Sequence, residues 1–94
     1  MNPTFLKISD NIAKGELTRV RLTKIEELPN AEVPNNKPVG TVREGSCSAV
    51  PEVGKQFCVA RSMSGVFLTS EVVEIHDEES CIMTHNSLYK IELL

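Results

Sequence analysis

Two arginines and a lysine in the first third of the chain have the spacing of an anion-binding group. Arg19 and Arg21 are two residues apart, and Lys24 follows them. Side chains at i and i+2 of a strand point to the same face about 6.6 Å apart, so a strand here would present both guanidinium groups together. Guanidinium pairs at that spacing suit phosphate or carboxylate groups. Arg19, Arg21 and Lys24 are therefore the predicted ligand-binding or partner-binding residues.

The alternative interpretation of these residues is an ordinary solvated strand face. Half-exposed strands usually carry charged side chains on the side that faces water. In that case the arginines would pair across the sheet with acids such as Glu71 or Glu74.

His76, Cys81 and His85 are the residues that most resemble metal ligands. A hairpin with residues 78–79 at its tip places His76 opposite Cys81, and His85 opposite Val72. His85 then lies four cross-strand pairs away, roughly 13 Å along the strand. Zinc ligands must all reach one ion, so no metal site is predicted.

Catalysis by a nucleophile or by paired acids is not predicted either. Cys58 lies inside an alternating strand, with no glycine-rich elbow or helix N-terminus to activate it, and is expected to be a buried, inert thiol. The acids at 77–79 are expected to be solvated at a turn, whereas catalytic acids need burial or a close partner. The five glycines match no phosphate-binding or dinucleotide-binding motif. We therefore expect neither an enzyme nor a cofactor.

The charge distribution restricts the partner. The net charge is −3, with seven basic and six acidic residues in the first 47 positions and three against seven in the rest. A negative chain disfavours non-specific binding to nucleic acid or anionic membrane. Nucleic-acid recognition also adds aromatic side chains among the basic ones, and the segment from Arg19 to Lys24 has none. A phosphate-bearing small ligand or an acidic protein surface fits better.

Apolar patterning and cysteine usage indicate a cytoplasmic protein. No apolar run approaches the ~20 residues that cross a bilayer, and the N-terminus lacks the apolar region of a signal peptide. The three cysteines form no CxxC pair, as expected for free thiols in a reducing compartment.

Short alternating segments predict an all-β fold. Val20 and Leu22 alternate with charged residues, and a bulge near residues 23–24 would place Ile25 on the same face. In the segment 66–76, Val66 and Leu68 are even-numbered but Val73 and Ile75 are odd, which predicts a second slip near residues 70–71. Other strands are expected at 39–42, 56–61 and 87–93, one helical turn at 9–15, and an irregular stretch at 44–55.

Strands with mid-course breaks are typical of sheets that coil and close. We therefore predict a single domain spanning 1–94, a five- to six-stranded SH3-like or OB-like barrel of antiparallel, strongly bent strands. Three prolines and three asparagines at 29–38 predict an exposed loop or arm, which would act as a clamp or an oligomer contact.

The C-terminal half resembles short uncharacterised proteins encoded by phages and prophages. The similarity lies in the segments 51–57, 67–75 and 84–92, with a Thr69-Ser70 step inside a strand and an Asn86-Ser87 turn into the last strand. The resemblance implies a phage accessory protein with a small barrel, acting in the host cytoplasm.

These observations together favour a non-enzymatic binding protein. The resemblance implies that it antagonises a host system, by masking a host protein or by sequestering a small anionic ligand. The alternatives are a nucleic-acid-binding module that uses the basic strand, or a structural subunit of a larger assembly. A ligand site would form most easily between subunits, because a 94-residue barrel has little interior room. A homo-oligomer is therefore among the expected states.

Overall fold

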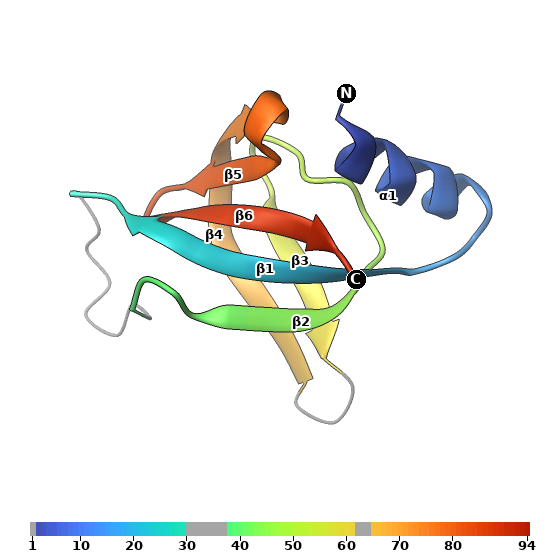
Figure 1. Cartoon of the computed structure of the whole chain (residues 1–94), viewed down its shortest axis with the longest axis horizontal. Helices are drawn as coiled ribbons and strands as arrows, with labels where there is room; N and C mark the ends of the chain where they lie inside the picture. Colours follow the sequence, from blue (N-terminus) through green and yellow to red (C-terminus); the bar gives the residue numbers. More distant parts are fainter. Residues whose placement is uncertain (1, 30–37, 62–64) are drawn as a thin grey trace.

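The computed structural model describes residues 2–29, 38–61 and 65–94. In this part of the chain, six strands form a closed antiparallel barrel in which the strand order follows the sequence and β6 returns to pair with β1 (Figure 1). The prediction of a small all-β, SH3-like or OB-like barrel is confirmed. The predicted loop at 29–38 lies, for residues 30–37, outside the described residues. The elements are α1 (Pro3–Ala13), β1 (Thr18–Glu27), β2 (Val42–Cys47), β3 (Gln56–Arg61), β4 (Gly65–His76), the 3-10 helix η1 (Asp77–Glu79), β5 (Cys81–Thr84) and β6 (Ser87–Leu93).

The interior of the barrel is mainly aliphatic, because each strand turns alternate residues inward. Five of the six strands place at least one aliphatic or aromatic side chain in the core, and β2 contributes a cysteine. The buried core consists of Phe5, Ile8, Val20, Leu22, Cys47, Phe57, Val59, Val72, Ile82 and Ile91.

The bulge in β1 lies later than predicted. The register with β6 shifts between Lys24 and Glu26, beyond the expected position at 23–24. Regular alternation therefore continues through Lys24, whose side chain points inward and is 1% exposed. Ile25 is left on the outer face, 41% exposed, so its predicted place beside Val20 and Leu22 is wrong.

The predicted slip in β4 is confirmed. Leu68 lies opposite Cys58, but Glu71 lies opposite Gln56, so one extra residue of β4 is accommodated between these pairs. A second shift follows between Val72 and Glu74. Two bulges bend this strand sharply, as a closed barrel of few strands requires.

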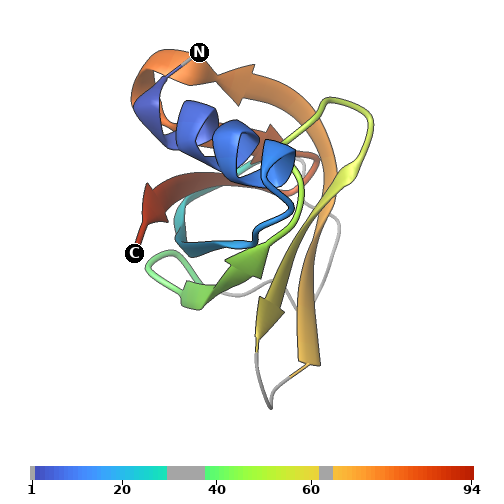
Figure 2. The same cartoon turned by 90° about the vertical axis from the view of Figure 1, so that its right-hand side faces the viewer.

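The first helix is longer than the single turn predicted at 9–15. Asn2 caps α1, because its side-chain oxygen accepts a hydrogen bond from the Phe5 amide at 2.9 Å, and Pro3 suits the first helical turn. Phe5 and Ile8 point into the barrel core, so α1 packs across one end of the barrel (Figure 2). Gly15 adopts φ 74° after the helix, as expected for a residue that terminates it.

The strand predicted at 39–42 is wrong except for Val42, because residues 38–41 form a turn with Gly40 at φ 93° and the Thr41 amide donating to the Pro38 carbonyl at 3.1 Å. The segment predicted to be irregular contains most of β2, and Gly45 explains this second error. It lies in the middle of β2, where a Cβ atom would be 2.4 Å from the Ala60 carbonyl oxygen and 2.8 Å from a methyl carbon of Val59. Glycine here signals close approach of two backbones, not a turn.

We expect Gly45→Ala to destabilise the protein by about 1–3 kcal/mol, because the added methyl group must push β2 away from the backbone of β3. Urea unfolding followed by circular dichroism measures this change. Ser46→Ala is the matched control, since residue 46 points to the outer face beside it. Equal midpoints for the two variants would contradict the close approach.

Candidate binding surface

A row of outward-facing residues crosses four strands near one end of the barrel. Arg19 of β1 lies opposite Ser46 of β2, Ser46 opposite Ala60 of β3, and Ala60 opposite Val66 of β4. Neighbouring strands are ~4.8 Å apart, so the row spans roughly 14 Å. The two residues in the middle of the row, Ser46 and Ala60, have small side chains, whereas Arg19 and Val66 at its ends have a long and a branched side chain. A hollow therefore forms between the ends of the row.

This hollow is an open groove of about 380 Å³. Two of its lining residues are exposed aliphatics, Leu17 at 63% and Val66 at 59%. Two are arginines, Arg19 and Arg61, from β1 and β3. Ser46, Ala60 and Gly65 complete the lining. The groove thus combines apolar contact area with two cations, and it is the best candidate for a functional site.

The two predicted arginines differ in what they contact. Arg21 donates from Nε to Glu44 Oε2 at 2.7 Å, and this hydrogen bond and the charge of Glu44 raise the pKa of the guanidinium. Among the described residues, the Arg19 guanidinium has no hydrogen bond or ion pair. The partner of Arg21 is therefore Glu44 on β2, and Arg19 is the member of the pair that remains available to a ligand.

Lys24 does not belong to the same surface. Its ammonium group lies inside the barrel wall, 3.6 Å from a carboxylate oxygen of Glu27. The reason is the alternation of β1, which sends Val20, Leu22 and Lys24 inward while Arg19 and Arg21 point outward. The structure thus separates Lys24 from the arginines with which the sequence grouped it.

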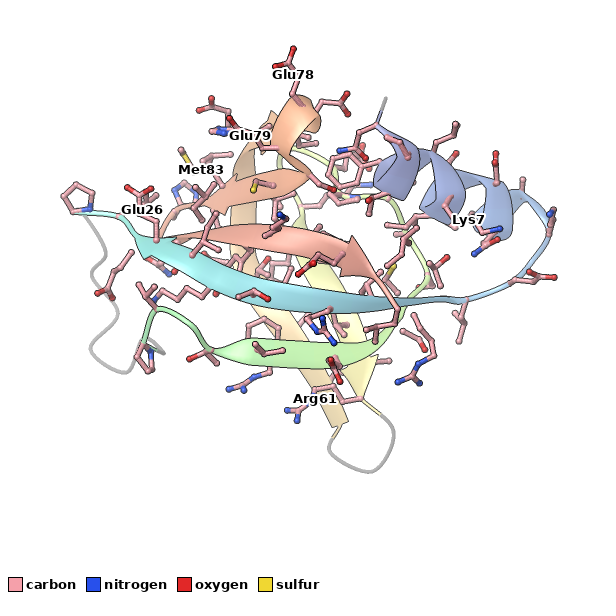
Figure 3. All side chains as sticks on the ribbon, viewed as in Figure 1. Lys7, Glu26, Arg61, Glu78, Glu79 and Met83 are labelled. Carbon is pink, nitrogen blue, oxygen red and sulfur yellow. The ribbon has the colours of Figure 1, made fainter. Side chains whose placement is uncertain are left out.

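Arg61 is the residue that sequence reasoning missed. It ends β3 and lies next to the β3–β4 hairpin (Figure 3). Some 40 residues separate it from Arg19, so only the strand order and register bring the two to one groove. The sequence feature that could have pointed to Arg61 is its position at the end of the strand predicted at 56–61.

A second cluster, Arg43 with Phe67 and Tyr89, is part of the barrel wall. The Arg43 guanidinium lies 5.5 Å from the centroid of the Phe67 ring, and Phe67 meets Tyr89 edge to face at 6.2 Å. Both rings are half-buried. Cation–π and aromatic contacts of this kind stabilise a fold, and here Arg43 covers one face of the Phe67 ring.

The histidine hairpin has the predicted pairing at its start but not farther along. His76 lies opposite Cys81 as expected, yet Val72 pairs with Thr84 and not with His85, because of the bulge before Glu74. The turn is the 3-10 helix η1 with Ser80 at φ 57°, not a two-residue tip. No group of metal-ligating side chains is found in the described parts of the chain.

His76 contacts carboxylates instead. Its Nε2 lies 3.1 Å from Glu74 and its Nδ1 3.5 Å from Glu79. The open depression around it is lined mainly by acids, so this side of the molecule repels anions.

The cysteines differ in exposure. Cys47 and Cys81 are buried, and Cys58 is exposed. Burial raises the pKa of the Cys47 thiol to about 11, and burial and then the Glu79 carboxylate raise that of Cys81. The prediction of a buried Cys58 is wrong, because its neighbours Phe57 and Val59 take the inner face of β3.

No family model, curated protein or solved structure matches the chain. The resemblance to phage proteins therefore stays a prediction. Of the helices in the described residues, none has the length and apolar character needed to cross a membrane.

We expect one of the three thiols to react rapidly with a thiol reagent at about pH 8, and this thiol to be Cys58, because the other two are buried and protonated. Peptide mapping after limited labelling identifies it. All three should react in guanidinium chloride. Rapid native labelling of Cys47 would contradict the burial.

The raised pKa of Cys47 also predicts a loss of stability in alkali. The folded state holds this proton more tightly than the unfolded state, so the contribution is complete below the ordinary pKa of 9.0 and is lost as the pH rises towards about 11. Urea midpoints measured across this interval should fall less for Cys47→Ala than for the native chain.

Proposed function

We propose that this chain is a non-enzymatic binding protein whose groove holds an acidic, extended segment of another protein. The supporting observation is that Arg19 and Arg61 lie in one groove with the exposed side chains of Leu17 and Val66. Cations beside apolar side chains hold a partner; they do not by themselves transform one. Masking a surface of the partner is the effect such binding would have.

The openness of the groove favours a protein segment over a small ligand. Small-molecule sites enclose most of the ligand surface, whereas this groove lies across the outer face of four strands. Protein interfaces are enriched in arginine and rely on a few well-placed anchors. Aspartate or glutamate side chains of the partner would reach the guanidinium groups, and alternate apolar side chains would contact Leu17 and Val66.

Nucleic acid fits this surface less well. Phe67 and Tyr89 contact each other, and Arg43 lies over Phe67, away from the groove lining. The net charge of −3 adds a general repulsion of polyanions. The proposal that the protein antagonises a host system rests on the phage resemblance, and masking a host protein is the form of antagonism that this groove would serve.

Selection from a random peptide library tests the proposal without a known partner. Peptides that bind the immobilised native protein should be rich in aspartate or glutamate with apolar residues between them. Arg19→Glu should weaken their binding roughly ten- to hundredfold, since it removes a charge-assisted hydrogen bond and adds repulsion. Lys7→Glu is the matched control, because it makes the same charge change on α1, and Lys7 does not line the groove.

Two results would overturn this assignment. One is a set of selected peptides without acidic residues, or with equal affinity for the Arg19→Glu and Lys7→Glu proteins. The other is tight binding of a single-stranded thymidine oligonucleotide that weakens steeply with salt, which would indicate the nucleic-acid alternative. Retained thermal stability in the Arg19→Glu protein shows that lost binding is not unfolding.

A further inference from the structure

The groove contains the two arginines whose guanidinium groups are not engaged elsewhere in the described part of the chain. The protein has four arginines. Arg21 is held by a carboxylate at 2.7 Å, and Arg43 lies over an aromatic ring. Arg19 and Arg61 make no hydrogen bond or ion pair with any residue that the structure describes. The two arginines that remain available to a ligand therefore share one surface.

The residues between these two cations are small. Arg19 lies opposite Ser46, Ser46 lies opposite Ala60, and Arg61 follows Ala60 on β3. Adjacent strands lie ~4.8 Å apart, so the backbones of β1 and β3 are separated by roughly 10 Å. A hydroxyl and a methyl group leave the space above this floor open. Two long guanidinium side chains can therefore reach one anion there from opposite sides.

The charge of the groove suits a dianion better than a carboxylate. Of its described lining residues, two are arginines and none is acidic. A carboxylate carries one negative charge on two oxygens, so it neutralises one guanidinium and leaves the other unpaired. A phosphate ester carries about −1.5 to −2 charges at pH 7 and three strong acceptor oxygens. It can accept from both guanidinium groups and from the Ser46 hydroxyl at once.

The aliphatic side chains beside the arginines favour a phosphate that is attached to a peptide. Leu17 is 63% exposed and Val66 59%, and inorganic phosphate would leave both uncovered. A serine or threonine ester is short, so it keeps the partner backbone close enough for the neighbouring apolar residues to contact Leu17 and Val66. A tyrosine ring would hold that backbone farther from the groove.

We propose that the groove recognises a phosphorylated serine or threonine within the partner segment. Arg19 and Arg61 hold the phosphate from two sides, and Ser46 donates a hydrogen bond from the floor. This inference rests on the proposed function, because the segment is the one inferred there, and it adds the residue of the segment that gives most of the selectivity. Association would then respond to phosphorylation of the partner.

Peptides from the library selection, each made in three forms, test the inference. One acidic position at a time is replaced by phosphoserine or by serine, and affinity for the native protein is measured by titration calorimetry. At one position phosphoserine should bind at least about tenfold more tightly than the acidic residue, and serine more weakly than either. Phosphoserine no tighter at any position would overturn this inference and leave the acidic-segment proposal intact. A selection without acidic residues would overturn both.

Variants of Arg61 test the role of the second cation. Arg61→Gln should remove most of the preference for phosphoserine, and Arg61→Lys should restore only part of it, because an ammonium group lacks the paired donors of a guanidinium. Lys7→Gln is the matched control, since it removes one positive charge from α1 outside the groove lining. An unchanged preference in an Arg61→Gln protein of native thermal stability would overturn the two-arginine site.

The pH dependence of binding gives a readout that a carboxylate does not share. The second pKa of phosphoserine is about 6, so the affinity of the phosphopeptide should fall roughly threefold between about pH 7.5 and 5.5 as the dianion gains a proton. A glutamate side chain has a pKa of about 4.3 and stays ionised. Both arginines stay charged, and neither His76 nor His85 lines the groove. A flat profile for the phosphopeptide would overturn the inference, as would equally tight binding of inorganic phosphate or of the phosphotyrosine peptide.

Discussion

The close approach of β2 and β3 at Gly45 is the constraint on which the rest of the molecule depends. Among the described residues, Ser46 and Ala60 form the one cross-strand pair between these strands, directly beside the point where a Cβ atom on Gly45 would meet the Ala60 carbonyl. Without that approach the sheet would stay open between β2 and β3. The barrel would not close, and the row from Arg19 to Val66 would be split in two.

The same contact determines which charges share a surface. Closure carries β3 next to β2 and so brings Arg61 to the groove that contains Arg19, while β2 supplies Glu44 to neutralise Arg21. Acids and His76 gather on the η1 turn, where they form a separate depression. The molecule therefore has one region suited to anions and another that repels them, although its net charge is only −3.

The sequence by itself determined the barrel and several of its details. Alternation in 18–24, 56–61 and 87–93 is a local property of extended chains, so the strands, the slip near Ser70 and the pairing of His76 with Cys81 could be derived from it.

Tertiary structure decided the other features of the fold and the site. The bulge in β1 lies slightly later along the chain than predicted, and this shift turned the Lys24 side chain inward and the Ile25 side chain outward. The length of α1 depends on the burial of Phe5 and Ile8 in the barrel core, which only the folded barrel provides. The requirement for glycine at position 45 comes from the Ala60 carbonyl on the neighbouring strand. Arg61 joined Arg19 because a closed sheet places distant strands side by side, and no local pattern records which strands those will be.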